Sequence, residues 1–307
     1  AARKMLISVR DSRKLELILV FLCFGSSMFI TNDVALITFV PFALRVLEFA
    51  GLQRRLIHVV VMQTVAANLG SMLTPVGNPQ NLYLYSTSGM SLGRFLGLML
   101  PYTLLSAALI FFFVFAHKKV PLGETPVQTE TQSVCSWKAV VYGILFLLCL
   151  GCVARLVPVW VMVPVILAVV LFMDRQTLKY VDYSLLLTFV GFFVFIGNMG
   201  RVETFCGFLE NIIDGHEILT AALSSQIISN VPAALLLSGF TREWEALILG
   251  TNIGGLGTLI ASMASLISFK LYTKCYKENR GRYLRWFTLV NIIYLFLLLT
   301  AALYLYR

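Results

Sequence analysis

The residues best suited to chemistry in this chain are amides, hydroxyls and glycines that interrupt long apolar runs. Residues 68–81 read Asn-Leu-Gly-Ser-Met-Leu-Thr-Pro-Val-Gly-Asn-Pro-Gln-Asn, and residues 252–265 read Asn-Ile-Gly-Gly-Leu-Gly-Thr-Leu-Ile-Ala-Ser-Met-Ala-Ser. Glycine lets the backbone approach a ligand, and proline removes an N–H donor and ends a helix. The carbonyl oxygens freed in this way are ligands of hard cations. The two runs therefore predict a pair of binding loops for a small ion.

One carboxylate, Asp33, is the only one of the 15 acidic residues that we place at membrane depth. A charge there costs at least about 2.5–3.5 kcal/mol, so it marks a functional site by default. Its partner would be Na⁺, a proton or the exposed amides at the hairpin tip, and capping of the second hairpin arm is the alternative. For the small residues, the alternative is close packing between helices. The candidates for cation binding or coupling are Asp33, Asn68, Gly70, Ser71, Gly77, Asn252, Gly254 and Gly255.

Two asparagines follow hydroxyl residues at what we expect to be the tips of helical hairpins. Asn32 follows Thr31, and Asn230 follows Ser229. Asparagine offers both a donor and an acceptor, and the start of a helix presents free N–H groups that suit an anion. Capping would explain one such tip, whereas two tips with two broken helices favour a substrate site. The substrate-binding candidates are Thr31, Asn32, Asn78, Pro79, Asn81, Ser229, Asn230, Val231 and Thr258.

The composition indicates which elements position these residues. Hydrophobic residues make up 59% of the 307 residues and charged residues 13%, about half the charged share of a typical soluble domain. Several apolar runs approach or exceed the ~20 residues that span a bilayer. They are 95–116, 138–154, 157–173, 183–199, 244–269 and 286–306. We therefore expect an all-α polytopic protein of the cell (inner or plasma) membrane, whose net charge of +9 reflects basic cytoplasmic loops rather than nucleic-acid binding.

The distribution of lysine and arginine predicts a topology. The apolar run 15–44 has basic residues on both sides, so we expect it to enter and leave by the cytoplasmic face as a re-entrant hairpin. Treating 218–240 as a second re-entrant hairpin puts most of the 24 basic residues on the cytoplasmic side, and letting either segment span reduces that excess. Residues 1–14 and the loop 117–137 are then cytoplasmic, and the C-terminus is outside.

Each half of the chain then has a hairpin, a broken helix and an unbroken helix, in that order. These are 15–44, 56–85 and 95–116 in the first half, and 218–240, 244–271 and 286–306 in the second. The predicted domains are a first inverted repeat, 1–116, a linker, 117–137, and a second inverted repeat, 138–307. Broken helices in inverted repeats form the binding sites of many secondary transporters. Because the second repeat has more residues before its hairpin, we expect N-terminal helices to be missing from the first.

Other kinds of chemistry are not indicated. The sequence contains no Walker A loop, no His-Glu-x-x-His motif and no Ser-His-Asp order, so we expect no enzyme. The histidines, His58, His117 and His216, are dispersed along the chain. We therefore expect no metal site beyond possible Na⁺ sites, and no other cofactor.

The motifs Thr31-Asn32-Asp33, 68–81, Ser229-Asn230-Val231-Pro232 and 250–255 resemble those of the ion-transporter superfamily. The resemblance is specifically to its citrate-transporter-like and divalent-anion:sodium symporter group, with arsenite permeases and Na⁺/H⁺ antiporters as relatives. The resemblance implies a homodimer with a scaffold domain and a transport domain that moves as an elevator. It also implies that Na⁺ and a substrate carboxylate are held at two opposed hairpin tips by Ser-Asn-Thr motifs. Here the third-position Thr is replaced by Asp33 and Val231, and the Asn-Asp pair resembles the arsenite permeases instead.

The sequence is therefore consistent with three functions. The first is Na⁺- or H⁺-coupled transport of a small anion, a carboxylate or oxyanion. The second is an arsenite or Na⁺/H⁺ antiporter that uses Asp33 as the titrating group. The third is a passive channel. The expected partners are the small anion, Na⁺ or H⁺, the lipid bilayer and a second copy of the chain.

Overall fold

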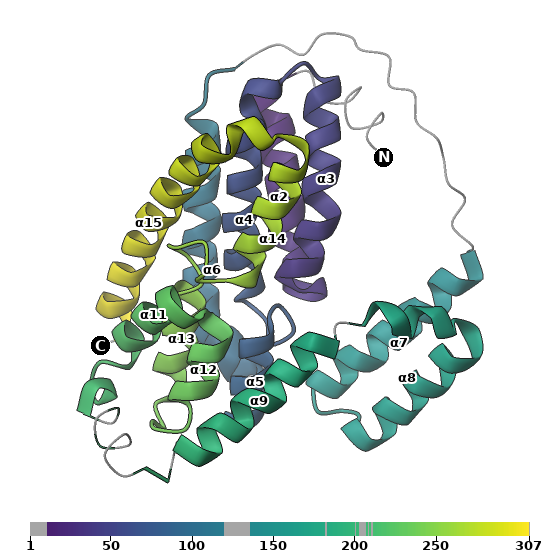
Figure 1. The fold of residues 1–307 in the computed structure, drawn as a ribbon, viewed down its shortest axis with the longest axis vertical. Helices are drawn as coiled ribbons and strands as arrows, with labels where there is room; N and C mark the ends of the chain where they lie inside the picture. Colours follow the sequence, from purple (N-terminus) through teal and green to yellow (C-terminus); the bar gives the residue numbers. More distant parts are fainter. Residues whose placement is uncertain are drawn as a thin grey trace. The chain divides into compact units, whose positions relative to one another are not determined.

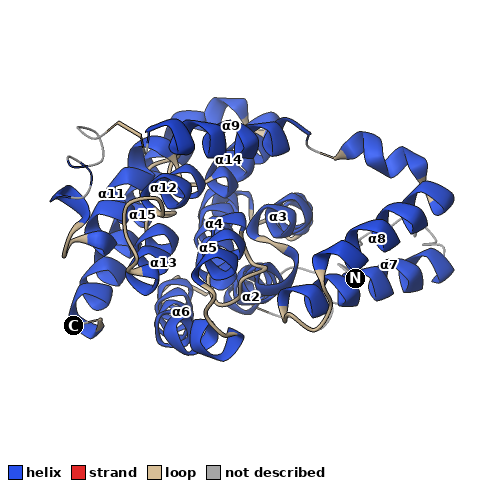
Figure 2. Ribbon diagram, turned by 90° about the horizontal axis from the view of Figure 1, so that it is seen from below, coloured by secondary structure: helices blue, strands red, loops and turns tan. Residues whose placement is uncertain are grey.

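The computed structural model describes residues 11–119, 136–181, 183–199, 201–202, 207, 209 and 211–306. Apart from turns, loops and one isolated bridge residue, these residues are helical, and Figure 2 shows the described helices in one colour with no strand among them. The prediction of an all-α fold is therefore confirmed. Most of the predicted linker 117–137, and residues 1–10 of the predicted cytoplasmic segment, lie outside the described residues.

The described residues fall into two compact units, one built from 11–119 and 199–306 and a smaller one from 136–198. The smaller unit contains four helical segments. They are α7 (Ser136–Val153), α8 (Val159–Met173), the short η2 (Arg175–Tyr180) and α9 (Tyr183–Met199). Helix α8 contacts both α7 and η2. The candidate site residues all lie in the larger unit.

The first part of the larger unit begins with a helical hairpin. Helices α2 (Ser12–Ile30) and α3 (Asn32–Phe49) meet at the single residue Thr31, and both pack on α4 (Leu56–Ser71). Nearly every residue of α4 is buried, as expected of a helix that is apolar on all sides. After the irregular segment 72–78, the chain continues as α5 (Pro79–Ser88).

The second part repeats this order. Helices α11 (Glu217–Ile228) and α12 (Asn230–Leu237) meet at Ser229. The chain then forms α13 (Trp244–Ile253), the irregular segment 254–262 and α14 (Met263–Cys275). The residues that sequence analysis assigned to hairpin tips and helix breaks are thus the residues at which these helices end.

In each part, the helix that follows the break packs on the other part. We call this helix the second arm of the broken helix, and the helix before the break its first arm. Helix α14 packs on α3 and α4 of the first part, whereas α5 packs on α12 and α13 of the second part (Figure 1). Each broken helix therefore starts against its own hairpin and, beyond its break, packs against the hairpin of the other part. This exchange of second arms brings the two breaks together, since Asn68 bonds Gly255 and Ser262, and Asn78 bonds Asn252.

Two further helices, α6 (Leu92–Phe115) and α15 (Arg280–Leu305), follow the two broken helices. Within the described residues, the segments Leu92–Phe115 and Lys277–Leu305 are long and apolar enough to cross a membrane, by length and composition alone. Both helices expose large apolar side chains, including Leu104 and Phe112 on α6 and Phe296 on α15. Such apolar surface is suited to contact with lipid.

Close approach of α2 and α4 depends on Gly70. A Cβ atom at this position would lie 2.1 Å from the carbonyl oxygen of Phe24 and 2.6 Å from Ser27 Oγ. We expect Gly70→Ala to lower the free energy of unfolding by about 1–3 kcal/mol, because α2 must move away from α4. Gly97→Ala is the matched control, since Gly97 also lies inside a helix but a Cβ there would have no atom within 4 Å. Denaturant titration in detergent compares the two variants, and equal stabilities would contradict this packing.

Candidate functional site

The two hairpin tips have the same unusual backbone conformation. Thr31 has φ 70° and ψ 152°, and Ser229 has φ 73° and ψ 152°. Residues other than glycine rarely adopt this region, and each such residue costs about 1–3 kcal/mol. Strain of this kind persists only where the surrounding contacts hold it, and it clusters at functional sites. Its occurrence at both tips marks them as candidate parts of a site.

Each tip is held by the break of the adjacent helix. The backbone N–H of Asn32 donates to the carbonyl of Gly77 at 3.0 Å, and that of Asn230 donates to the carbonyl of Ala261 at 2.9 Å. Gly77 and Ala261 occupy corresponding positions, since each immediately precedes the N-cap residue of the second arm. The hairpin and the broken helix are therefore joined in the same way in both parts.

A second pair of contacts repeats the correspondence. The Thr74 hydroxyl donates to the carbonyl of Met28, and the Thr258 hydroxyl donates to the carbonyl of Gln226 at 3.0 Å. Both acceptors lie at the C-terminal end of the first hairpin arm, where helix carbonyls have no helical partner. The two threonines satisfy carbonyls that a bilayer interior would leave without water.

The second arms begin with side-chain caps. Asn78 Oδ1 accepts from the N–H of Asn81 at 3.0 Å, with Pro79 in the first turn of α5. In α14, Ser262 Oγ accepts from the N–H of Ser265 at 3.2 Å. Such caps satisfy N–H groups that the start of a helix leaves free.

The caps also link the two broken helices to each other. Asn78 Nδ2 donates to Asn252 Oδ1 at 3.1 Å, and Ser262 Oγ donates to Asn68 Oδ1 at 3.2 Å. Each contact joins the cap of one broken helix to the asparagine near the end of the other helix's first arm. The Asn252 amide also donates to Asn81 Oδ1. We call Asn68, Asn78, Asn81, Asn252 and Ser262 the crossing cluster.

The crossing cluster is buried and connected to the first hairpin tip. Its members are at most 3% exposed. Asn32 Nδ2 donates to Asn68 Oδ1 at 3.2 Å, and Asn68 Nδ2 donates to the carbonyl of Gly255 at 3.4 Å. The second tip lies close to Gly255, as shown by the 2.8 Å that would separate a Cβ atom at this glycine from Asn230 Nδ2. The amides of both tips thus converge on the same buried cluster.

Asp33 makes the two tips chemically different. Its backbone N–H donates to Asn32 Oδ1 at 2.9 Å, so the first turn of α3 is capped by Asn32 and Thr31 and not by the Asp33 carboxylate. Among the described residues, the buried Asp33 Oδ1 has no hydrogen-bond partner. The second tip has Val231 in the corresponding position, and α12 has no side-chain cap.

The structure thus gathers most of the sequence-predicted residues around one place. Thr31, Asn32, Ser229 and Asn230 form the tips, and Gly70, Ser71, Gly77, Gly254 and Gly255 lie in or beside the breaks. Thr258 is exposed, and it reaches the hairpin only through its contact with Gln226. Gln226, which sequence reasoning did not select, binds the carbonyls of Gly254 and Leu256 at 2.8 and 3.0 Å.

Sequence reasoning also missed a cluster at the other end of α4. Ligand atoms of Glu16, His58 and His117 lie within 4.8 Å of one another, and the two imidazole rings are 3.6 Å apart between centroids. The expectation of no metal site depended on the dispersal of the histidines along the sequence, but the fold brings these two together. No local signal in the sequence pointed to this cluster, because its three members come from separate segments of the chain.

The tips of two helical hairpins meet two broken helices that are hydrogen-bonded to each other, and the helices expose apolar faces suited to lipid. This arrangement is typical of a membrane transporter. A family model described as citrate transporter matches residues 1–242, and the chain belongs to this family.

Three relatives are similar over most of the chain. An uncharacterized transporter of Methanocaldococcus jannaschii is 33% identical over 295 residues, which is 96% of this chain and 80% of the relative. The inner membrane protein YbiR of Escherichia coli is 31% identical over 276 residues, covering 88% of this chain and 72% of the relative. The magnetosome protein MamN of Magnetospirillum gryphiswaldense is 24% identical over 310 residues, covering 89% of this chain and 70% of the relative.

The contact between Asn78 and Asn252 predicts energetic coupling between the two broken helices. We expect Asn78→Ala and Asn252→Ala to be non-additive, with a coupling free energy of about 1 kcal/mol, because either substitution alone removes their shared hydrogen bond. A double-mutant cycle measured by denaturant titration in detergent gives this value. Asn78→Ala combined with Asn291→Ala is the control, since Asn291 is also buried but donates to Phe287 of its own helix. Additivity in both cycles would contradict the coupling.

Proposed function

We propose that this protein is a secondary active transporter that moves a small carboxylate or oxyanion across the membrane, coupled to Na⁺ or H⁺. The observation that carries the proposal is the convergence of both hairpin tips on the buried crossing cluster. The helix ends at the breaks and tips present partial charges, and in many secondary transporters such ends bind the substrate and the coupling ion. Family membership supports transport as the activity.

The proposal includes a topology. The two parts would be inverted repeats, with 15–44 and 218–240 as re-entrant hairpins that enter from opposite faces. The hydrogen bonds from Asn32 to Gly77 and from Asn230 to Ala261 support joint movement of each hairpin with its broken helix. Such joint movement is what an elevator mechanism requires, and a homodimer would provide the fixed scaffold. The Ser-Asn motif at the second tip and the Asn-Asp motif at the first would hold substrate and coupling ion.

The difference between the tips suggests how the two ligands are divided. At the first tip, the Asp33 carboxylate is the fixed negative charge and suits a cation. At the second tip, α12 begins with Asn230 and Val231, with no acidic residue in its first turn and no side-chain cap. The positive end of this helix suits an anion. We therefore assign the coupling ion to the Asp33 side and the anion to the Asn230 side.

Uptake into liposomes tests the proposal. The full chain, reconstituted with an inward Na⁺ or H⁺ gradient, should show saturable uptake of one small carboxylate or oxyanion. Asn230→Ala should reduce initial uptake at least about tenfold, because a hydrogen bond to a charged group is lost. Asn211→Ala is the control, since Asn211 is exposed and lies outside the cluster. Uptake that persists when both gradients are collapsed would rule out the coupling.

The unpartnered Asp33 Oδ1 favours one second candidate, an arsenite or Na⁺/H⁺ antiporter in which Asp33 binds the coupling cation. In that case, Asp33→Asn should abolish gradient-driven flux while leaving the thermal stability of the detergent-purified protein unchanged, because the asparagine keeps the shape but not the charge. Glu278→Gln is the control, since Glu278 lies in the short helix η3 (Lys277–Asn279) between α14 and α15. A variant that still couples flux to both gradients would exclude Asp33 as the coupling group under either function.

A further inference from the structure

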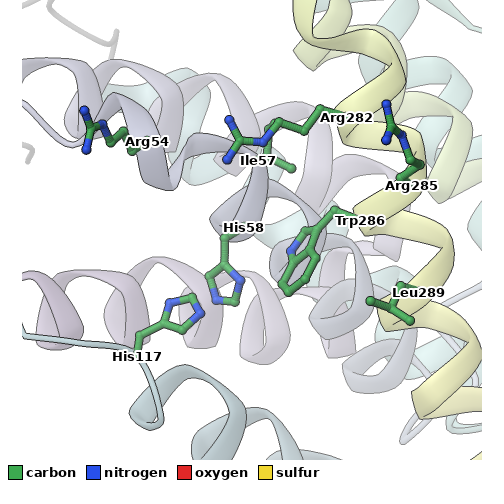
Figure 3. A pocket seen from close by; sticks show the side chains of 8 residues that line it. All are labelled: Arg54, Ile57, His58, His117, Arg282, Arg285, Trp286 and Leu289. Carbon is green, nitrogen blue, oxygen red and sulfur yellow. The ribbon is translucent and has the colours of Figure 1, made fainter.

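A cavity lies at the end of the larger unit where α15 begins, among residues that the crossing cluster does not use. Its volume is about 590 Å³. Figure 3 shows the Trp286 ring of α15 beside the ring of His58 of α4, with His117 on the other side of His58. Arg282 and Arg285 of α15 also line the cavity. Arg54 and Leu289 complete the wall with Ile57.

The charge of this cavity is of one sign. Three guanidinium groups, those of Arg54, Arg282 and Arg285, line it, and no carboxylate does. The ion pairs found among the described residues include none of these three side chains. The neighbouring carboxylate is already engaged, because Glu16 Oε1 lies 2.6 Å from Arg55 Nη1 and Glu16 Oε2 lies 3.3 Å from His117 Nδ1.

Two buried groups in the same wall have unused hydrogen-bonding capacity. The indole N–H of Trp286 is buried and has no acceptor among the described residues. His58 is 7% exposed, and neither of its ring nitrogens has a partner there. A buried donor without an acceptor costs free energy. Three arginines with unpaired charge and two unsatisfied ring systems therefore point to a ligand that is rich in acceptors and negatively charged.

A divalent metal held by Glu16, His58 and His117 is the competing occupant of this region. The guanidinium of Arg55 opposes it, because Arg55 Nη1 lies 2.6 Å from Glu16 Oε1 and 3.2 Å from His117 Nδ1. A cation bound by Glu16, His58 and His117 would be repelled by this guanidinium group, which lies within hydrogen-bonding distance of two of the three ligands.

We propose that this cavity binds a phosphate group, supplied either by free inorganic phosphate or by the headgroup of an anionic phospholipid. Guanidinium groups match phosphate oxygens in paired hydrogen bonds. The indole N–H of Trp286 and a protonated nitrogen of His58 would donate to the remaining oxygens. The site is separate from the crossing cluster and does not depend on the transported substrate.

Calorimetric titration of the full chain with inorganic phosphate, in detergent without phospholipid, tests the site. The double variant Arg282→Gln with Arg285→Gln should bind phosphate at least about tenfold more weakly than the unsubstituted chain, because two charged donors are lost. Arg280→Gln is the matched control on the same helix, since Arg280 lies over the Phe269 ring and does not line the cavity. Its affinity should stay within about twofold of the unsubstituted chain. No phosphate binding, or an equal loss in the control, would overturn a free-phosphate site.

The indole N–H is tested separately. Trp286→Phe retains an aromatic ring and removes only the donor, so phosphate affinity should fall about threefold or more. Loss of phosphate binding in Asn230→Ala but not in the Arg282→Gln, Arg285→Gln double variant would assign the phosphate to the transport site and overturn the proposal.

Nanodiscs distinguish the two sources of phosphate. If the natural ligand is a lipid, discs of phosphatidylglycerol should abolish phosphate binding and discs of phosphatidylcholine should not. If both kinds of disc leave phosphate binding intact, the ligand is free phosphate. Absence of binding in all of these media, or micromolar Zn²⁺ binding that His58→Ala removes while phosphate fails to bind, would overturn the proposal.

Discussion

The structure of the larger unit depends on one constraint, which is that helix ends inside a bilayer must find hydrogen-bond partners within the protein. Two broken helices create four such ends in one place. The solution is reciprocal: Asn78 of one helix bonds Asn252 of the other, and Ser262 bonds Asn68. Neither broken helix satisfies its own break alone. The exchange of second arms, with α5 on the second hairpin and α14 on the first, follows from this mutual dependence.

The same constraint explains the strained tips. Thr31 and Ser229 are each followed by an asparagine whose N–H must reach a carbonyl in a break, and that carbonyl belongs to Gly77 or Ala261. In both tips a single residue with φ near 70° directs that N–H to the carbonyl. The strain is therefore offset by two hydrogen bonds that would otherwise be lost in an apolar medium. Each hairpin is thereby fixed to the helix that it must accompany.

Sequence reasoning predicted the all-α class and the residues at which the hairpin and broken helices end, because these features are local. Glycine, proline and asparagine in residues 68–81 predict a break in the helix, whatever the segment packs against. The partner of each asparagine was not predictable, since the periodicity of a helix carries no information about which other helix it meets. The cluster of Glu16, His58 and His117 shows this limit best. These residues come from α2, α4 and the end of α6, and each looks ordinary within its own segment.

The crossing cluster consists of amides and a hydroxyl and contains no charged side chain, and transport gives a physical reason for this. Under the proposed function the substrate site must return without substrate, and a fixed charge there would have to cross hydrocarbon at a cost of several kcal/mol. Asn68, Asn78, Asn81 and Asn252 bond to one another or to the first tip in this structure, so the cluster is uncharged and its amides are internally hydrogen-bonded. Under the proposed function, a substrate would compete with these contacts, which favours release as well as binding. Asp33 is the exception. Under the proposed function, its charge makes movement without a bound cation unfavourable, and that penalty is what would couple the ion to the anion.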